Sequence, residues 1–240
     1  MSQDQFEKLF IDKGIVTVED MKDYSPQQVF DAVVGILQKL VVMGSKDQTI
    51  RRKAREITKG VLPHDDWGEV TTIIKWIQDN VKYHYDGFNI EQFQLPTKTL
   101  SEMAGDCDCL AVLAASLLRS IGHQAGVVLV NTGGRDDVDH AMSILTFRKD
   151  IVLQWGVKGK DGKVESITKE FASGLPDELK IPLKTIKGSS TDHYNWILAE
   201  VTEKKPVGWT PENITYAIVI LPEIVTRIDI VPNASENMKI

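Results

Sequence analysis

The sequence predicts an α+β fold in which helices come first and an antiparallel sheet follows. Up to Gly122, apolar residues recur at three-and-four spacing, the period of helices with one buried face. From Gln124 onward, short apolar or alternating runs are separated by turn residues, a pattern typical of strands. Helices and strands segregated in this way indicate a layer of helices packed on one sheet.

Three helices are predicted between residues 25 and 83. The first begins at Ser25-Pro26, a serine N-cap with proline in the first turn, and ends near Gly44. Its apolar residues cover a wide arc, so we expect it to dock against the rest of the protein. The other two helices span 47–60 and 67–83. The segment before residue 25 is mainly polar, and we expect a short helix and a loop there.

A fourth and central helix follows an extended lead-in at 94–100 and a turn at 100–104. It begins at Cys107 and stops at Gly122, a glycine of the kind that ends helices. Its apolar face consists of Leu110, Leu113, Ala114, Leu117, Leu118 and Ile121. This face predicts a buried helix.

The remainder of the chain is predicted to form the sheet. Strands are expected at 124–130, 140–147, 151–157, 196–202, 214–221 and 224–231. Residues 158–192 look like an insertion with a hairpin around 159–162. We therefore divide the chain into a helical N-terminal arm (1–49), a main domain (50–231) that contains this insertion, and a polar tail (232–240).

Composition and charge restrict the class of protein. The chain has 240 residues, is 42% hydrophobic and carries a net charge of −6, so it can bury one core and offers little attraction for nucleic acid or an anionic membrane. Its two cysteines are separated by a single residue and build neither a disulfide framework nor a zinc set. The longest apolar run, 111–118, is too short to span a bilayer. We expect a cytoplasmic protein without cofactor, metal, nucleic acid or membrane partner.

Cys107 is the candidate nucleophile because it opens the central helix. Unpaired N–H groups and the macrodipole at a helix N-terminus favour a negative charge, and therefore a thiolate. The neighbouring Asp106 and Asp108 oppose this effect unless Asp106 caps the helix and a histidine lies close by.

His140 is the candidate general base. It starts the alternating run that ends at Phe147, so its imidazole is expected at the beginning of one face of the sheet. A cysteine at a helix start and a histidine on a strand are the arrangement found in papain-like thiol enzymes.

Four separated motifs occur in a characteristic order. They are Trp76-Ile-Gln-Asp-Asn-Val-Lys-Tyr83, Leu95-Pro-Thr-Lys-Thr-Leu100, Gly105-Asp-Cys-Asp108 with the helix behind it, and Asp139-His-Ala141. In these motifs the chain resembles the transglutaminase-like superfamily over residues 50–210, and within it the members encoded by bacteriophages and prophages. The resemblance implies a papain-like cysteine enzyme that acts on amide bonds, with Cys107 as the nucleophile. It also implies that the aromatic residues Tyr83 and Tyr85 lie near the rim of the cleft, although both could simply cover a helix end.

The resemblance also implies a third catalytic residue, an acid or amide that orients the histidine. At this residue the sequence departs from the family pattern. Relatives carry an aspartate or asparagine at the end of the next strand, but the run 151–157 contains no acid. After the insertion, residues 196–202 match the relevant motif with Glu200 in the acidic position. Glu200 is therefore the predicted acid, and Asp150 is its main rival.

Two further residues, and the backbone of Cys107 itself, are assigned roles around the nucleophile. Cys109 is expected to be a buried, passive thiol, since residues two apart on a helix point in different directions. The backbone N–H of Cys107 is a candidate oxyanion donor, and the side chain of Gln94 is a second one.

The sequence thus predicts a peptidase, isopeptidase or amidase that works through Cys107, His140 and Glu200 and a thioester intermediate on a polypeptide substrate. One alternative is a protein-glutamine acyltransferase that crosslinks by transglutamination. The other is a catalytically inactive phage structural or interaction protein with the same fold, associated with virion or assembly proteins.

Overall fold

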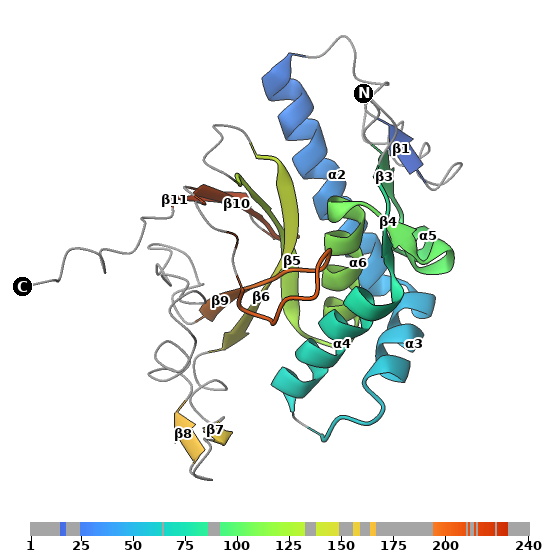
Figure 1. The fold of residues 1–240 in the computed structure, drawn as a ribbon. Coiled ribbons are helices and arrows are strands. Elements are labelled where there is room, and N and C mark those ends of the chain that lie inside the picture. Colours follow the sequence, from blue (N-terminus) through green and yellow to red (C-terminus); the bar gives the residue numbers. More distant parts are fainter. Residues whose placement is uncertain are drawn as a thin grey trace, which may run out of the picture.

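The protein is an α+β structure in which helices cover one side of a five-stranded antiparallel sheet (Figure 1). The computed structural model describes residues 15–17, 25–63, 65–85, 92–132, 138–148, 156–158, 164–166, 194–209, 211, 214, 216–223 and 225–229. The strand order is β11-β10-β5-β6-β9. These strands are β5 (Gln124–Val130), β6 (His140–Arg148), β9 (Tyr194–Ala199), β10 (Tyr216–Ile220) and β11 (Val225–Asp229). The predicted fold class is confirmed.

Helix α2 (Pro26–Lys46) is the long helix predicted from Ser25-Pro26, and it packs along the central helix α6. Ser25 and Gln28 form a reciprocal capping box that satisfies the first N–H groups of α2. By length and composition alone, Gln27–Lys46 could cross a membrane, a property that apolar helices of protein cores share. The docking expected from its apolar arc is confirmed.

Helices α3 (Gln48–Ile57) and α4 (Asp66–Asn80) follow, capped by Asp47 and Asp65. The prediction that the third helix continues to Tyr83 is wrong. Val81 is extended, with φ −97° and ψ 124°, and the next two residues form β2 (Lys82–Tyr83). They leave the helix because β2 pairs in parallel with β4 (Ala104–Gly105), directly before the central helix.

The segment before the central helix also differs from its prediction. Residues expected to be extended and then to turn form α5 (Pro96–Glu102), with Pro96 in the first turn. Met103 ends α5 in the left-handed region, at φ 54°. The extended part lies earlier than expected: it is β3 (Gln92–Gln94), which overlaps the predicted segment only at Gln94. It pairs with β1 (Ile15–Thr17), a strand in the segment where a short helix and a loop were expected.

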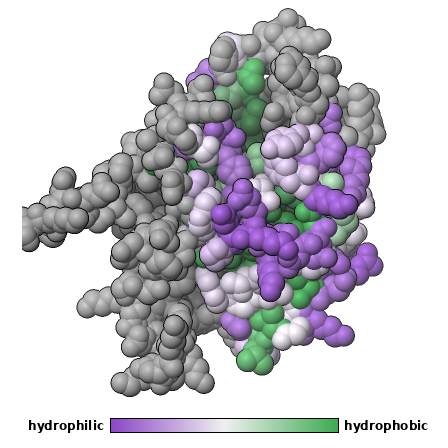
Figure 2. Space-filling model, in the orientation of Figure 1, coloured by the Kyte–Doolittle hydropathy of each residue, from purple (hydrophilic) through white to green (hydrophobic). Residues whose placement is uncertain are grey.

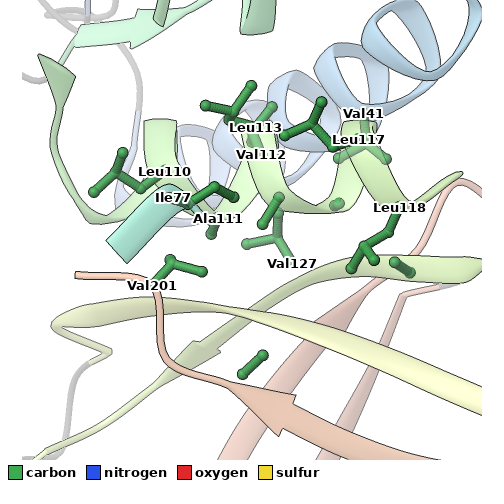
Figure 3. Packing of buried hydrophobic residues seen from close by; sticks show 14 of the residues in the cluster. Val41, Ile77, Leu110, Ala111, Val112, Leu113, Leu117, Leu118, Val127 and Val201 are labelled. Carbon is green, nitrogen blue, oxygen red and sulfur yellow. The ribbon is translucent and has the colours of Figure 1, made fainter. Parts of the chain in front are cut away.

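Helix α6 (Cys107–Ser120) is the centre of the structure. All of its residues except Cys107 and Arg119 are buried. Figure 3 shows its apolar side chains between the other helices and the sheet, with Val41, Ile77, Val127 and Val201 among their neighbours. The buried helix predicted from the sequence is confirmed, and burying it accounts for much of the hydrophobic stabilisation.

The sheet has two apolar faces. Ala141 and Leu145 on β6 belong to the cluster that contains α6, whereas Met142 and Ile144 belong to a second cluster on the opposite face. The same alternation holds on β9, where Ile197 faces the helices and Leu198 the second cluster.

The inserted region is described only in part. Strands β7 (Gly156–Lys158) and β8 (Val164–Ser166) pair as an antiparallel hairpin, as predicted around 159–162. The rest of 158–192, Asp150 and the tail from 232 lie outside the described residues. The described part of the surface in Figure 2 is mainly hydrophilic, with apolar side chains reaching the surface between polar ones.

Candidate active site

Cys107 is the first residue of α6, and a hydrogen bond joins the residue before it to the helix behind it. The side chain of Asp106, which is buried, caps the helix by accepting a hydrogen bond from the backbone N–H of Cys109 at 3.0 Å. The helix cap by Asp106, which the sequence indicated as a condition for a thiolate at Cys107, is therefore present. Cys107 itself is half-buried and packs at the edge of the main core cluster.

Strand β2 and the two residues after it bring Tyr83 and Tyr85 to the side of the molecule where Cys107 lies. Tyr83 pairs with Gly105, and the N–H of His84 donates to the Gly105 carbonyl at 2.9 Å. The rings of Tyr83 and Tyr85 contact each other edge to face, with centroids 4.8 Å apart, and Tyr85 is 77% exposed. Burial, and then the negative charge that Cys107 would carry as a thiolate, raise the pKa of Tyr83. Tyr83 is therefore a protonated hydroxyl close to Cys107 at neutral pH.

Cys109 points away from the surface into a different environment. It is 3% exposed, and its sulfur accepts a hydrogen bond from the backbone N–H of Gln94 at 3.4 Å. Burial, followed by the nearby carboxylates of Asp108 and Asp106, raises the pKa of the Cys109 thiol. Cys109 is thus kept protonated, and a protonated thiol is a poor nucleophile.

His140 and Glu200 are brought together by the sheet. His140 is the first residue of β6, Glu200 comes directly after β9, and the two strands are neighbours. His140 Nε2 lies 2.8 Å from Glu200 Oε2. The alternation of side chains explains this contact, because His140 shares a face with Met142 and Glu200 shares the same face with Leu198.

The second oxygen of Glu200 is held by three donors. Oε1 accepts hydrogen bonds from the backbone N–H of Val201 at 2.8 Å, and from the N–H and hydroxyl of Thr202 at 2.7 Å each. Burial raises the pKa of the Glu200 carboxyl, but hydrogen bonding and charge from His140 and the bonds from Thr202 outweigh it, so the net shift is downward. Glu200 is consequently an ionised carboxylate although its side chain is only 2% exposed.

Gln94, the candidate side-chain oxyanion donor, lies on β3. Its Oε1 accepts a hydrogen bond from the hydroxyl of Thr99 at 3.2 Å. Because the carbonyl end of the amide is held by Thr99, the Nε2 end is the one that can donate to another group.

Among the residues that the structure describes, two groups of side chains have the chemistry and spacing of metal ligands. They are Asp66, Glu69 and His123, and Asp106, Asp108 and Cys109; within each group the ligand atoms lie within 4.8 Å of one another. In the first group His123 Nε2 is bonded to Glu69 Oε2 at 2.8 Å. In the second group, the raised pKa of Cys109 disfavours the thiolate that a metal would need.

Residues 51–164 match the model of the transglutaminase-like superfamily. The matched segment covers somewhat less than half of the chain and contains Cys107 and His140, but it ends before Glu200. The family model supports a cysteine-enzyme fold for this segment, in agreement with the helix and sheet arrangement.

Two solved structures are similar to the chain. A candidate protease from Parabacteroides distasonis is 15% identical, with 47% of this chain and 24% of that chain covered and a TM-score of 0.38. A candidate cysteine protease from Cytophaga hutchinsonii is 12% identical, with 93% and 55% covered and a TM-score of 0.37. The chain thus spans about a quarter of the first protein and about half of the second. No curated protein sequence matches it.

The contacts that surround Glu200 were not predicted from the sequence. The three donors from Val201 and Thr202 are local, and a threonine two residues after the acid is the only signal for them. Gln78 on α4 also reaches this segment, where its Nε2 donates to the backbone carbonyl of Glu200 at 2.8 Å. The one sequence signal for this contact was a polar residue, Gln78, beside the apolar positions Ile74 and Ile77 of the helix.

Proposed function

We propose that the protein is a cysteine-dependent amide-bond enzyme, a peptidase, isopeptidase or amidase, in which Cys107, His140 and Glu200 form the triad. The observation that carries the proposal is the 2.8 Å contact between His140 Nε2 and an ionised, nearly buried Glu200. A desolvated carboxylate bonded to an imidazole orients the ring and stabilises its protonated form. The family match that includes Cys107 and His140 supports the same chemistry.

The tautomer of His140 follows from this contact. When the neutral ring donates from Nε2 to Glu200, its Nδ1 is the acceptor nitrogen and serves as the base. Cys107 begins a helix, where the macrodipole favours the thiolate. Val138, two residues before His140, packs against the same apolar cluster as Cys107.

The reaction has two halves. His140 Nδ1 takes the thiol proton, and the Cys107 sulfur attacks the amide carbonyl to give a tetrahedral oxyanion. The oxyanion collapses, the carbon–nitrogen bond breaks, and the imidazolium gives its proton to the leaving amine. Water, deprotonated by His140, then attacks the resulting thioester, and the thiol is regenerated as the acid product leaves.

The oxyanion needs donors aimed at it. The backbone N–H of Cys107 and the Nε2 of Gln94 are the two we assign to this task. Tyr83 and Tyr85 present an aromatic surface on the side of the site where Cys107 lies, and such a surface suits an extended polypeptide substrate in the cytoplasm. We favour water over an amine as the acceptor; transglutamination is the outcome if an amine replaces water in the second half.

A non-catalytic role is the second candidate, and one observation favours it. Side-chain alternation along β6 assigns His140 to the face of Met142, whereas α6 packs on the face of Ala141. A thiol that does not meet the imidazole would make the chain an interaction protein, for instance a component that assembles with phage virion proteins.

The test is the pH dependence of alkylation by iodoacetamide, with mass-spectrometric assignment of the modified cysteine. In the wild type we expect Cys107 to react at pH 6 as a thiolate, and His140→Ala to slow this reaction by about 100-fold, since a free thiol of pKa about 8.5 is under 1% ionised there. Glu200→Gln should give an intermediate rate.

The controls assign the reacting group. Cys107→Ser should abolish the label and Cys109→Ala should leave it unchanged. Slow wild-type alkylation with an ordinary thiol profile, unaltered in His140→Ala, would overturn the enzymatic function and leave the interaction protein. If the pair is active, trapping the thioester of a peptide amide with hydroxylamine or with a primary amine separates hydrolysis from transglutamination.

A further inference from the structure

Glu200 begins a segment that one amide of the helical layer holds at both ends. The segment 200–205 leaves the sheet after β9 and turns back toward α4. The side chain of Gln78 on α4 is half-buried, and its Nε2 donates to the carbonyl oxygens of Glu200 and of Lys205, at 2.8 Å each. Both protons of one amide are therefore used, one at each end of the segment.

The other contacts of the segment are weaker or local. Lys204 pairs with Asp79 of α4 at 2.6 Å, but the lysine side chain is 74% exposed, and exposed pairs of this kind contribute little. The bond from Lys205 N–H to the Glu203 carbonyl lies within the segment itself. Val201 packs beside Ile77 and α6 (Figure 3). This apolar contact sets the distance of the segment from the helices, but it leaves the backbone of the segment free to rotate.

The rotation of the backbone at Glu200 decides where its carboxylate points. Glu200 accepts through Oε1 from the next two residues, so the carboxylate moves together with the turn that they form. A hydrogen bond that holds the Glu200 carbonyl therefore also sets the orientation of Oε2 relative to His140 Nε2.

We propose that Gln78 is a positioning residue for the triad: its bridge between the Glu200 and Lys205 carbonyls holds the Glu200 carboxylate in line with His140 Nε2. This inference rests on the proposed function for its effect on Cys107, but the effect on the His140–Glu200 bond is independent of it. Gln78 touches neither the substrate nor the reacting atoms in this role.

The experiment compares two amides on the same helix. Gln78→Met keeps the length of the side chain and removes both donors. Asn80→Leu is the matched control, because the Asn80 amide bonds only to the Trp76 carbonyl of its own helix and is exposed. The readouts are the pH profile of Cys107 alkylation and the NMR signal of the His140 Nε2 proton, each alongside urea unfolding.

We expect Gln78→Met to move the alkylation profile of Cys107 toward that of Glu200→Gln, with a rate at pH 6 lowered at least threefold, and to broaden or shift the Nε2 proton signal. Asn80→Leu should change neither. If Gln78→Met does not fold, Gln78→Asn serves instead, since it keeps the amide but is one methylene too short to reach both carbonyls.

The outcomes separate the two proposals. A wild type with His140-dependent alkylation and a Gln78→Met variant that behaves like Asn80→Leu in both readouts would overturn the positioning role and leave the enzyme. A wild type without activated alkylation would overturn the enzymatic function, and the Nε2 proton signal would then decide the role of Gln78 alone: an unchanged signal in Gln78→Met rejects it.

Discussion

The imidazole of His140 and the carboxylate of Glu200 meet at the end of the β6–β9 ladder, 2.8 Å apart and sixty residues apart in sequence. The two oxygens of the carboxylate have separate partners, His140 for Oε2 and the Val201–Thr202 turn for Oε1. The turn holds the acid in place whether or not the imidazole is charged.

Thr202→Val should destabilise the protein by about 1.5 kcal/mol, because hydrogen bonds to an ionised group are stronger than neutral ones. The Thr202 hydroxyl donates to Glu200 Oε1 at 2.7 Å. Urea unfolding measures the change. Thr71→Val is the control, since the Thr71 hydroxyl bonds to carbonyls of its own helix. An equal loss of unfolding free energy in the two variants would mean that the bond to the ionised Glu200 is no stronger than a neutral hydrogen bond.

Glu200→Gln should change how stability depends on pH. The pKa of Glu200 is lowered in the folded protein from an ordinary value of 4.5, so its charge stabilises the fold above that pH, and the contribution is lost as the pH falls through the lowered value. The gap in unfolding free energy between wild type and Glu200→Gln should therefore narrow from pH 5 toward pH 3. Urea titrations at several pH values test this, and a gap that stays constant over the range contradicts it.

Cys109 should resist alkylation in the folded protein even at pH 9, because burial raises the pKa of its thiol and keeps reagents out. Cys107→Ser isolates the remaining thiol for this measurement. In denaturant the Cys109 thiol should react at an ordinary rate. Rapid labelling of Cys109 in the folded variant would show that α6 opens, and the assignment of Cys107 as the sole reactive cysteine would then fail.

Gly44→Ala should cost about 2 kcal/mol or more, as overpacked cores do. A Cβ at Gly44 would lie 2.3 Å from Ser116 Oγ and 2.7 Å from Pro96 Cγ, so α2 could not keep its distance from α6. Gly35 on the same helix has no atom within 4 Å of such a Cβ, and Gly35→Ala should stabilise by about 0.5–1 kcal/mol. Thermal unfolding compares them; similar midpoints for both variants would contradict the close packing at Gly44.

The parts of the fold that the sequence predicted are those with strong local signals. The capping residues at Ser25 predicted the start of α2, and the apolar period of 107–122 predicted α6. Burial of these helices in the core stabilises the same structure that the local signals favour. The short helix α5 was missed although Pro96 in its first turn was a helix-start signal. Strand β2 was missed because pairing with Ala104–Gly105, distant in sequence, overrides the helical pattern that leads into it.

The residues of the candidate site differ in how strongly the sequence points to them. Cys107 and His140 stand in motifs with characteristic neighbours, whereas Glu200 had to be chosen by its resemblance to a motif beyond an insertion. The structure pairs Glu200 with His140, and the rival Asp150 lies outside the described residues. Gln78 and Thr202 act through backbone atoms and a turn, and neither kind of contact leaves a clear pattern in one sequence.

The pairing of Arg148 with Tyr194, at the end of the β6–β9 ladder opposite to His140 and Glu200, closes a long stretch of chain between the two strands. The entropic cost of closing a loop grows only with the logarithm of its length, so doubling the stretch would cost about 0.6 kcal/mol. A large change in the length of this stretch changes the stability of the fold only slightly. Residues can therefore be gained or lost between the histidine and its acid during evolution, while the ladder keeps the two side chains in register.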